Sequence, residues 1–121
     1  MSTMEDIIKA IKESDRTEGE KEDMLDILQA RMRVITGYFG SVAKIKAELQ
    51  LADGAGDEYR KTAGKYEELQ KSCSDSCKRL NRMCEDLQID PFCDFDPDDK
   101  EKLEAFCGQM MMGLFMKGIR K

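Results

Sequence analysis

Residues 18–51 read EGEKEDMLDILQARMRVITGYFGSVAKIKAELQL and contain no proline. Apolar residues recur along this segment at alternating spacings of three and four, as they do on one face of an α-helix. The row consists of Leu25, Leu28, Met32, Ile35, Phe39, Val42 and Leu49. A second row lies beside it and consists of Met24, Ile27, Val34, Tyr38 and Ile45. Because the combined stripe is wider than a contact between two helices needs, we expect one long helix at the centre of a bundle.

Two glycines lie inside this expected helix. Gly37 and Gly40 each cost about 1 kcal/mol relative to alanine in a helix interior. We interpret them as positions where a neighbouring helix packs closely. A bend in the helix is the alternative.

A second long helix is expected after a short turn. Residues 52–57 read ADGAGD, in which glycine suits the left-handed residue that ends a helix and Asp57 can cap the next one. Residues 57–88 then carry apolar side chains at intervals of seven, with others on the same face. These are Tyr59, Tyr66, Cys73, Leu80 and Leu87, together with Ala63, Leu69, Cys77, Met83 and Cys84. Because the turn is short, the two long helices should lie antiparallel and side by side.

Shorter helices are expected at both ends of the chain. Residues 1–16 predict a short helix that Thr3 caps, followed by a charged linker, and we expect this helix to be a separate, mobile arm. Beyond the hairpin, Asp96 followed by Pro97 is typical of a helix cap and a first helical residue. This pair predicts a C-terminal helix over residues 97–117.

Together these elements predict an all-α fold. We expect a single domain over residues 1–121, an up-and-down helical bundle built on a long antiparallel helix hairpin, with a C-terminal helix and a short N-terminal helical arm. A chain of 121 residues can bury a substantial core and is too short for two independent ones.

Charge and hydropathy argue against several classes of function. The formal net charge is −5, so the molecule repels phosphate backbones and nucleic-acid binding is not expected. The N-terminus carries acids where a secretory signal needs a basic start, which predicts a cytoplasmic protein with reduced cysteines. The longest mostly apolar run, residues 105–116, has about half the length of a membrane span, so no transmembrane segment is expected.

Cysteines form the one constellation that resembles a site. Cys73, Cys77 and Cys84 fall on one face of the second long helix, and Cys93 follows just past its end. The sequence has no histidine, and Cys73 and Cys84 would be roughly 16 Å apart along a helix, too far to share one ion. Our main interpretation is that these thiols fill the core. The alternative is a metal-binding or redox-sensing role, with Cys77, Cys84 and Cys93 as the candidates.

The C-terminal helix is rich in methionine. Residues 109–116 read QMMMGLFM and place apolar side chains on more than one side of the helix. Methionine is flexible, and large exposed apolar patches tend to mark interfaces. Three interpretations stay open, in this order: burial in the chain's own core, contact with a second copy or another protein, and contact with a membrane surface. The interface candidates are Met110, Met111, Leu114 and Phe115.

The inventory of reactive groups does not favour an enzyme. Without histidine the proton-transfer groups are carboxylates, lysines, tyrosines and cysteines, and none of them forms a recognisable catalytic arrangement. We expect no cofactor. Wide apolar helix faces favour a non-enzymatic helical protein–protein interaction or regulatory module, which forms a homodimer or binds another helical protein. The competing hypothesis is a cysteine-based metal-binding or redox-sensing helical protein.

Overall fold

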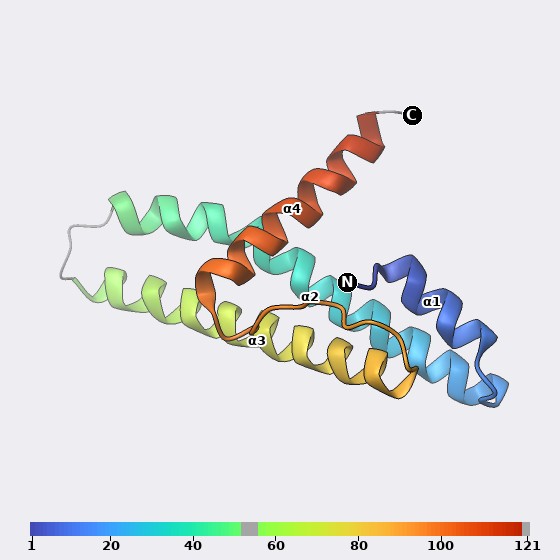
Figure 1. The fold of residues 1–121 in the computed structure, drawn as a ribbon. Coiled ribbons are helices and arrows are strands. Elements are labelled where there is room, and N and C mark those ends of the chain that lie inside the picture. Colours follow the sequence, from blue (N-terminus) through green and yellow to red (C-terminus); the bar gives the residue numbers. More distant parts are fainter. Residues whose placement is uncertain (52–55, 120–121) are drawn as a thin grey trace.

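Four helices form the part of the chain that the structure describes. The computed structural model describes the backbone of residues 1–51 and 56–119 and the side chains of residues 1–51 and 56–109. The helices are α1 (Met4–Glu13), α2 (Glu18–Leu51), α3 (Asp57–Asp86) and α4 (Lys100–Ile119). Over these residues there is no strand, and α2 and α3 lie side by side as a hairpin (Figure 1). The predicted all-α helical hairpin bundle is confirmed, while most of the predicted turn lies outside the described residues.

Helix α2 is the centre of the bundle, as its wide apolar stripe predicted. It packs against each of the other three helices. Its buried residues come from both predicted rows and are Leu28, Ile35, Tyr38, Val42 and Ile45. The largest buried apolar residues of α3 are Leu80 and Met83, which sit among the cysteines. Near the turn the hairpin is uncovered, since Leu51 is 86% exposed and Tyr59 is 37% exposed. The core therefore occupies the half of the hairpin away from the turn.

The N-terminal helix is part of this core, so the prediction of a separate arm is wrong. Ile7 and Ile11 are both 0% exposed and belong to the same core cluster as Leu28 and Leu80. A capping box between Thr3 and Asp6 begins the helix, as expected for Thr3. Figure 1 shows α1 lying along the first half of α2.

The segment that connects α3 to α4, residues 87–99, is tied down at several points. It starts with Gln88 in the left-handed region (φ 59°), where the N–H of Ile89 donates to the Cys84 carbonyl at 3.0 Å and closes α3. The Ser2 N–H donates to the Pro91 carbonyl at 2.8 Å, and this bond joins the connecting segment to the N-terminus. The chain start and the connecting segment are therefore held together.

Helix α4 begins three residues later than the sequence predicted. Asp96 and Pro97 form a turn in which the Asp99 N–H donates to the Asp96 carbonyl at 2.9 Å. Asp99, rather than Asp96, is the cap, because its carboxylate accepts from the Lys102 N–H at 3.3 Å. The prediction of Pro97 as the first helical residue is wrong because proline at the second position of a turn suits the same dipeptide equally well.

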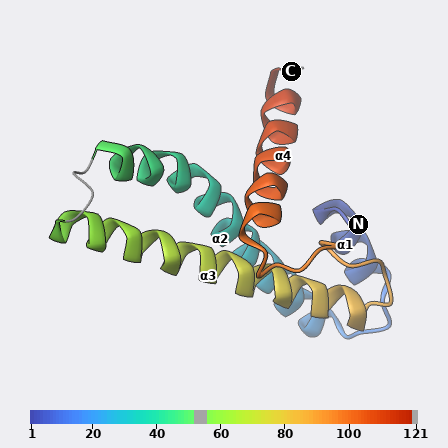
Figure 2. The same cartoon turned by 60° about the vertical axis from the view of Figure 1, so that its left-hand side comes forward.

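Gly37 and Gly40 do not mark close helix packing. No neighbouring atom lies within 4 Å of a Cβ built at either position, so that interpretation is wrong. The bend is the better explanation, since Figure 2 shows α2 curving along its length. The hydroxyl of Thr36 donates to the Met32 carbonyl at 2.9 Å, a side-chain bond that often bends helices.

Replacing both glycines with alanine is expected to stabilise the protein. Each of Gly37→Ala and Gly40→Ala should raise the free energy of unfolding by about 0.5–1 kcal/mol, because alanine has less backbone freedom to lose and meets no clash. Thermal unfolding followed by circular dichroism measures the change. A fall in the melting temperature would show instead that the curve of α2 requires glycine at these positions.

No helix in the described ranges has both the length and the apolar character needed to cross a membrane.

Candidate functional site

The first half of α4, residues 100–109, is anchored on the hairpin, and we call it the root of α4. Leu103 is 1% exposed and Cys107 is 0% exposed, so both face the core. The Glu104 carboxylate accepts from Lys46 Nζ of α2 at 2.7 Å and from the Tyr66 hydroxyl of α3. The root therefore contacts both long helices by apolar and polar groups.

The second half of α4, residues 110–119, extends away from the bundle, and we call it the distal half. Figures 1 and 2 show its backbone continuing past α1, α2 and α3 in both views. All four interface candidates, Met110, Met111, Leu114 and Phe115, belong to this half, and their side chains lie outside the described residues. Helix α4 therefore continues through the apolar residues 110–119, although its backbone no longer lies along the hairpin there.

Four cysteine thiols form a continuous row inside the core, which we call the thiol row. The Sγ atoms of Cys107 on α4 and Cys73 on α3 are 3.8 Å apart. Cys73 and Cys93 are the thiol neighbours of Cys77, and their hydrogen bonding lowers its pKa. The order along the row is therefore Cys107, Cys73, Cys77, Cys93. Each of these residues is at most 2% exposed.

The thiol row differs from the set of candidates named from the sequence. Cys77 and Cys93 are brought together, but Cys84 stands apart and has the Ser2 hydroxyl and the Phe92 backbone as its polar neighbours. Cys107 was not among the candidates. Only the packing of α4 on the hairpin places it beside Cys73.

Asn81 fixes the position of Cys93 at the end of the row. Its side-chain oxygen accepts from the Cys93 N–H at 3.0 Å, and its amide nitrogen donates to the Cys93 Sγ at 3.3 Å. Because Asn81 is one turn beyond Cys77 on α3, this pair of bonds holds the connecting segment against the same helix. The row is therefore built by α3, by α4 and by the segment between them.

The electrostatics of the row single out Cys77. Hydrogen bonding to Cys107 and Cys77, with burial in addition, raises the pKa of Cys73. Interaction with Cys77, together with burial, raises the pKa of Cys93. Hydrogen bonding with Cys73 and Cys93 lowers the pKa of Cys77, although burial opposes this effect. A negative charge in the row is therefore best stabilised on Cys77.

These thiols are arranged in a line and do not surround a common point as the ligands of a metal ion do. A tetrahedral zinc site needs four ligands around one point, with zinc–sulfur distances of about 2.3 Å. Within residues 1–51 and 56–109, no three cysteine, aspartate or glutamate side chains are grouped in a way that could hold a metal ion. The chemistry open to the row in this geometry is that of neighbouring thiol pairs.

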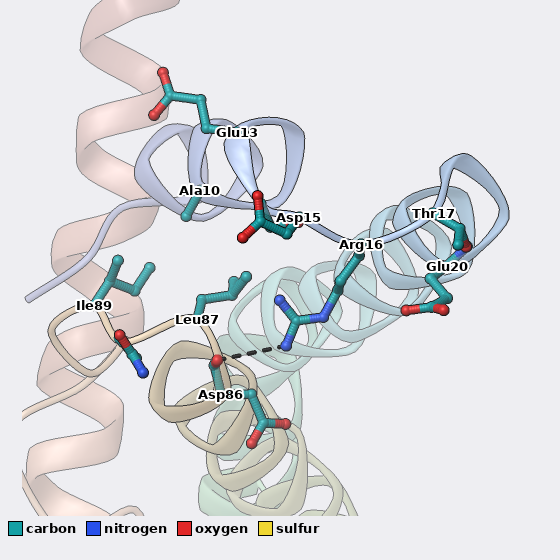
Figure 3. Close-up of a pocket in the computed structure, with 11 residues that line it drawn as sticks. Ala10, Glu13, Asp15, Arg16, Thr17, Glu20, Asp86, Leu87 and Ile89 are labelled. Atoms are coloured by element: carbon teal, nitrogen blue, oxygen red, sulfur yellow. Dashed lines mark hydrogen bonds between the residues drawn. The ribbon is translucent and has the colours of Figure 1, made fainter.

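A polar depression of about 690 Å³ lies between the end of α1 and the end of α3 (Figure 3). Arg16 reaches across it, and its Nη2 donates to the Asp86 carbonyl at 3.4 Å, where a cation complements the negative end of α3. The carboxylates of Glu13, Glu20 and Asp86 point apart in Figure 3. They do not converge on a common point, so we assign no ligand to this depression.

No family model, curated protein or solved structure matches this chain.

Proposed function

We propose that this protein is a non-enzymatic helical interaction module that self-associates through the distal half of α4. The observation that carries the proposal is that the helix continues for residues 110–119 after its backbone has left the hairpin (Figures 1 and 2). The sequence of these residues, MMMGLFMKGI, is almost entirely apolar. An apolar helix end that leaves its own bundle favours association, because burial removes apolar surface from water.

The energetics of a helix end support the same proposal. Isolated helices shorter than about 12–15 residues are marginal in water, so a projecting helical segment gains stability from packing. Burying a methionine, leucine or phenylalanine side chain contributes about 1.5–3 kcal/mol each. Several such residues on one short segment supply enough to offset the entropy lost on association.

A second copy of the chain is the partner that the charge distribution favours. The whole chain carries a net charge of −5, yet Lys117, Arg120 and Lys121 make its C-terminal end basic. In an antiparallel pair of α4 helices, Lys117 of one copy would approach Glu101 of the other, and Glu101 is exposed on the root. The proposal includes a cytoplasmic location, because all five cysteines are free thiols.

Polar substitutions in the distal half test this proposal. The double variant Met111→Gln and Phe115→Gln is expected to convert a dimer to a monomer in native mass spectrometry and in light scattering. Helicity by circular dichroism should remain near that of the unmodified protein. Ile27→Gln is the matched control, since Ile27 is an apolar residue of α2 that is 46% exposed, and it should leave the dimer intact.

Two outcomes would overturn the proposal. One is an unmodified protein that stays monomeric at every concentration tested. The other is a loss of helicity in the double variant that is as large as the loss of dimer, which would mark Met111 and Phe115 as core residues of their own chain.

A further inference from the structure

The order of the thiol row restricts how its members can pair. Each inner thiol, Cys73 and Cys77, has one outer neighbour: Cys107 beside Cys73, and Cys93 beside Cys77. If the two inner thiols joined each other, both outer thiols would be left without a partner. That inner pair also lies four residues apart on one helix, where a disulfide would distort the backbone. The four thiols therefore pair without remainder in one way, Cys73 with Cys107 and Cys77 with Cys93.

We propose that the thiol row is an oxidation site, which a peroxide converts into two disulfides, Cys73–Cys107 and Cys77–Cys93, while Cys84 remains a thiol. The first disulfide joins α3 to the root of α4. The second joins α3 to the connecting segment. Both link elements that are far apart in sequence, so oxidation locks α4 and the connecting segment onto the hairpin. The inference is independent of the proposed self-association.

The reaction of the Cys77 pair begins with the sulfur that best holds a negative charge. The Cys77 thiolate attacks one oxygen of hydrogen peroxide, the O–O bond breaks, and the leaving hydroxide takes up a proton to become water. Cys77 is then a sulfenic acid. The Cys93 sulfur attacks the Cys77 sulfur, the S–O bond breaks, and the oxygen leaves as a second water with the proton of the Cys93 thiol. Two thiols thus give two electrons to one peroxide.

The second disulfide needs a second peroxide and the same two steps at Cys73 and Cys107. Their Sγ atoms are 3.8 Å apart, and bond formation must bring them to about 2.05 Å. The contact already places the two sulfurs next to each other, so side-chain rotation and a small approach of α4 are the movements required. Because the row is buried, peroxide reaches it when the connecting segment opens, a local event that costs less than global unfolding.

The bonds from Asn81 support this choice of partners. They hold both the backbone and the sulfur of Cys93 toward α3, beside Cys77. Cys84 is just as buried but faces the Ser2 hydroxyl and the Phe92 backbone, and no thiol is among its polar neighbours. The same core therefore contains four thiols arranged for pairing and a fifth that serves as an internal control.

Counting thiols after oxidation tests the inference. The reduced full-length protein is treated with hydrogen peroxide, the peroxide is removed with catalase, and the protein is denatured and alkylated with N-ethylmaleimide. Intact mass spectrometry is expected to show one added maleimide instead of five, and five again if a reductant precedes alkylation. Peptide mapping should identify Cys73–Cys107 and Cys77–Cys93. Five added maleimides after peroxide, disulfides between chains alone, or any disulfide that contains Cys84 would overturn the inference.

Two alanine variants separate this pairing from random oxidation. Cys107→Ala removes one outer thiol, so Cys77–Cys93 should still form while Cys73 and Cys84 each take up a maleimide. A Cys73–Cys77 disulfide in this variant would contradict the order of the row. Cys84→Ala is the matched control and should take up no maleimide after peroxide. If Cys107→Ala fails to fold, the peptide map of Cys84→Ala decides, because any pairing other than the two proposed counts against the inference.

Discussion

Truncating the core face of α1 is expected to destabilise the whole protein. Each of Ile7→Ala and Ile11→Ala should lower the free energy of unfolding by about 2–5 kcal/mol, because each removes a side chain that is 0% exposed and leaves a cavity. Small domains have only about 5–15 kcal/mol in total, so the double variant should be largely unfolded at room temperature. Urea titration followed by circular dichroism at 222 nm measures both effects.

Lys9→Ala is the matched control for this prediction. Lys9 lies between the two isoleucines on the exposed face of α1, so its replacement should change the free energy of unfolding by less than about 0.5 kcal/mol. A change of similar small size in Ile7→Ala and Ile11→Ala would mean that α1 detaches without disturbing the hairpin. A single cooperative transition with a lower midpoint is the result that α1 as a core element requires.

The hairpin could be predicted from the sequence because its signal is long. Apolar residues keep their spacing over the full length of α2 and α3, and many matching positions average out local exceptions such as Lys46. The sequence contains no comparably long pattern that predicts the docking of α1 on the hairpin. Its amphipathic face is visible in the sequence, but the partners of Ile7 and Ile11 belong to helices that follow a charged linker.

The start of α4 shows a different limit of local sequence reasoning. The Asp96-Pro97 pair suits a helix cap and a turn equally well, and the choice between them depends on distant contacts. Asp98 binds Lys78 Nζ at 2.8 Å and accepts from the Ser74 hydroxyl at 2.9 Å, both on α3. These contacts position the turn against the hairpin before α4 begins. Only the folded chain reveals them.

The thiol row combines a predictable part with an unpredictable one. Helical spacing of four was enough to place Cys73 and Cys77 on one face of α3, and all three cysteines of that helix are buried, as expected for core thiols. The outer thiols, Cys93 and Cys107, belong to elements whose positions no local sequence pattern predicts. Cys93 depends on the bonds from Asn81, and Cys107 depends on the packing of α4 on the hairpin. Contacts between elements, rather than spacing within them, decide which thiols meet.

Alkaline pH is expected to destabilise the protein steeply, by up to about 4 kcal/mol per pH unit between about pH 9 and pH 10. Thiols in an unfolded chain ionise near pH 8.5. In the folded protein the pKa values of Cys73, Cys84 and Cys93 are raised, by thiol hydrogen bonding and burial in the row and by burial at Cys84. Each folded thiol that keeps a proton which its unfolded counterpart has lost contributes about 1.4 kcal/mol per pH unit.

The sign of this effect follows from which state binds more protons. Above about pH 8.5 the unfolded chain binds fewer protons than the folded one, so the free energy of unfolding falls as pH rises. Below that pH the contribution of these thiols is fully present. Cys77 adds no slope in this window, because its lowered pKa leaves it ionised in both states. Burial raises the pKa of Tyr38 to about 12, so its own contribution begins only near the upper limit of the window.

Urea titrations at pH 8, 9 and 10, with a phosphine reductant to prevent disulfide formation, measure the slope. Cys84→Ala should reduce it by up to about 1.4 kcal/mol per pH unit, since it removes one of the three thiols with raised pKa and leaves the thiol row in place. If the free energy of unfolding of the unmodified protein fell by less than about 1.4 kcal/mol per pH unit, the value for a single thiol, Cys73 and Cys93 would ionise as easily in the folded chain as in the unfolded one. Such thiols would be open to solvent, and peroxide would then reach them without any opening of the connecting segment.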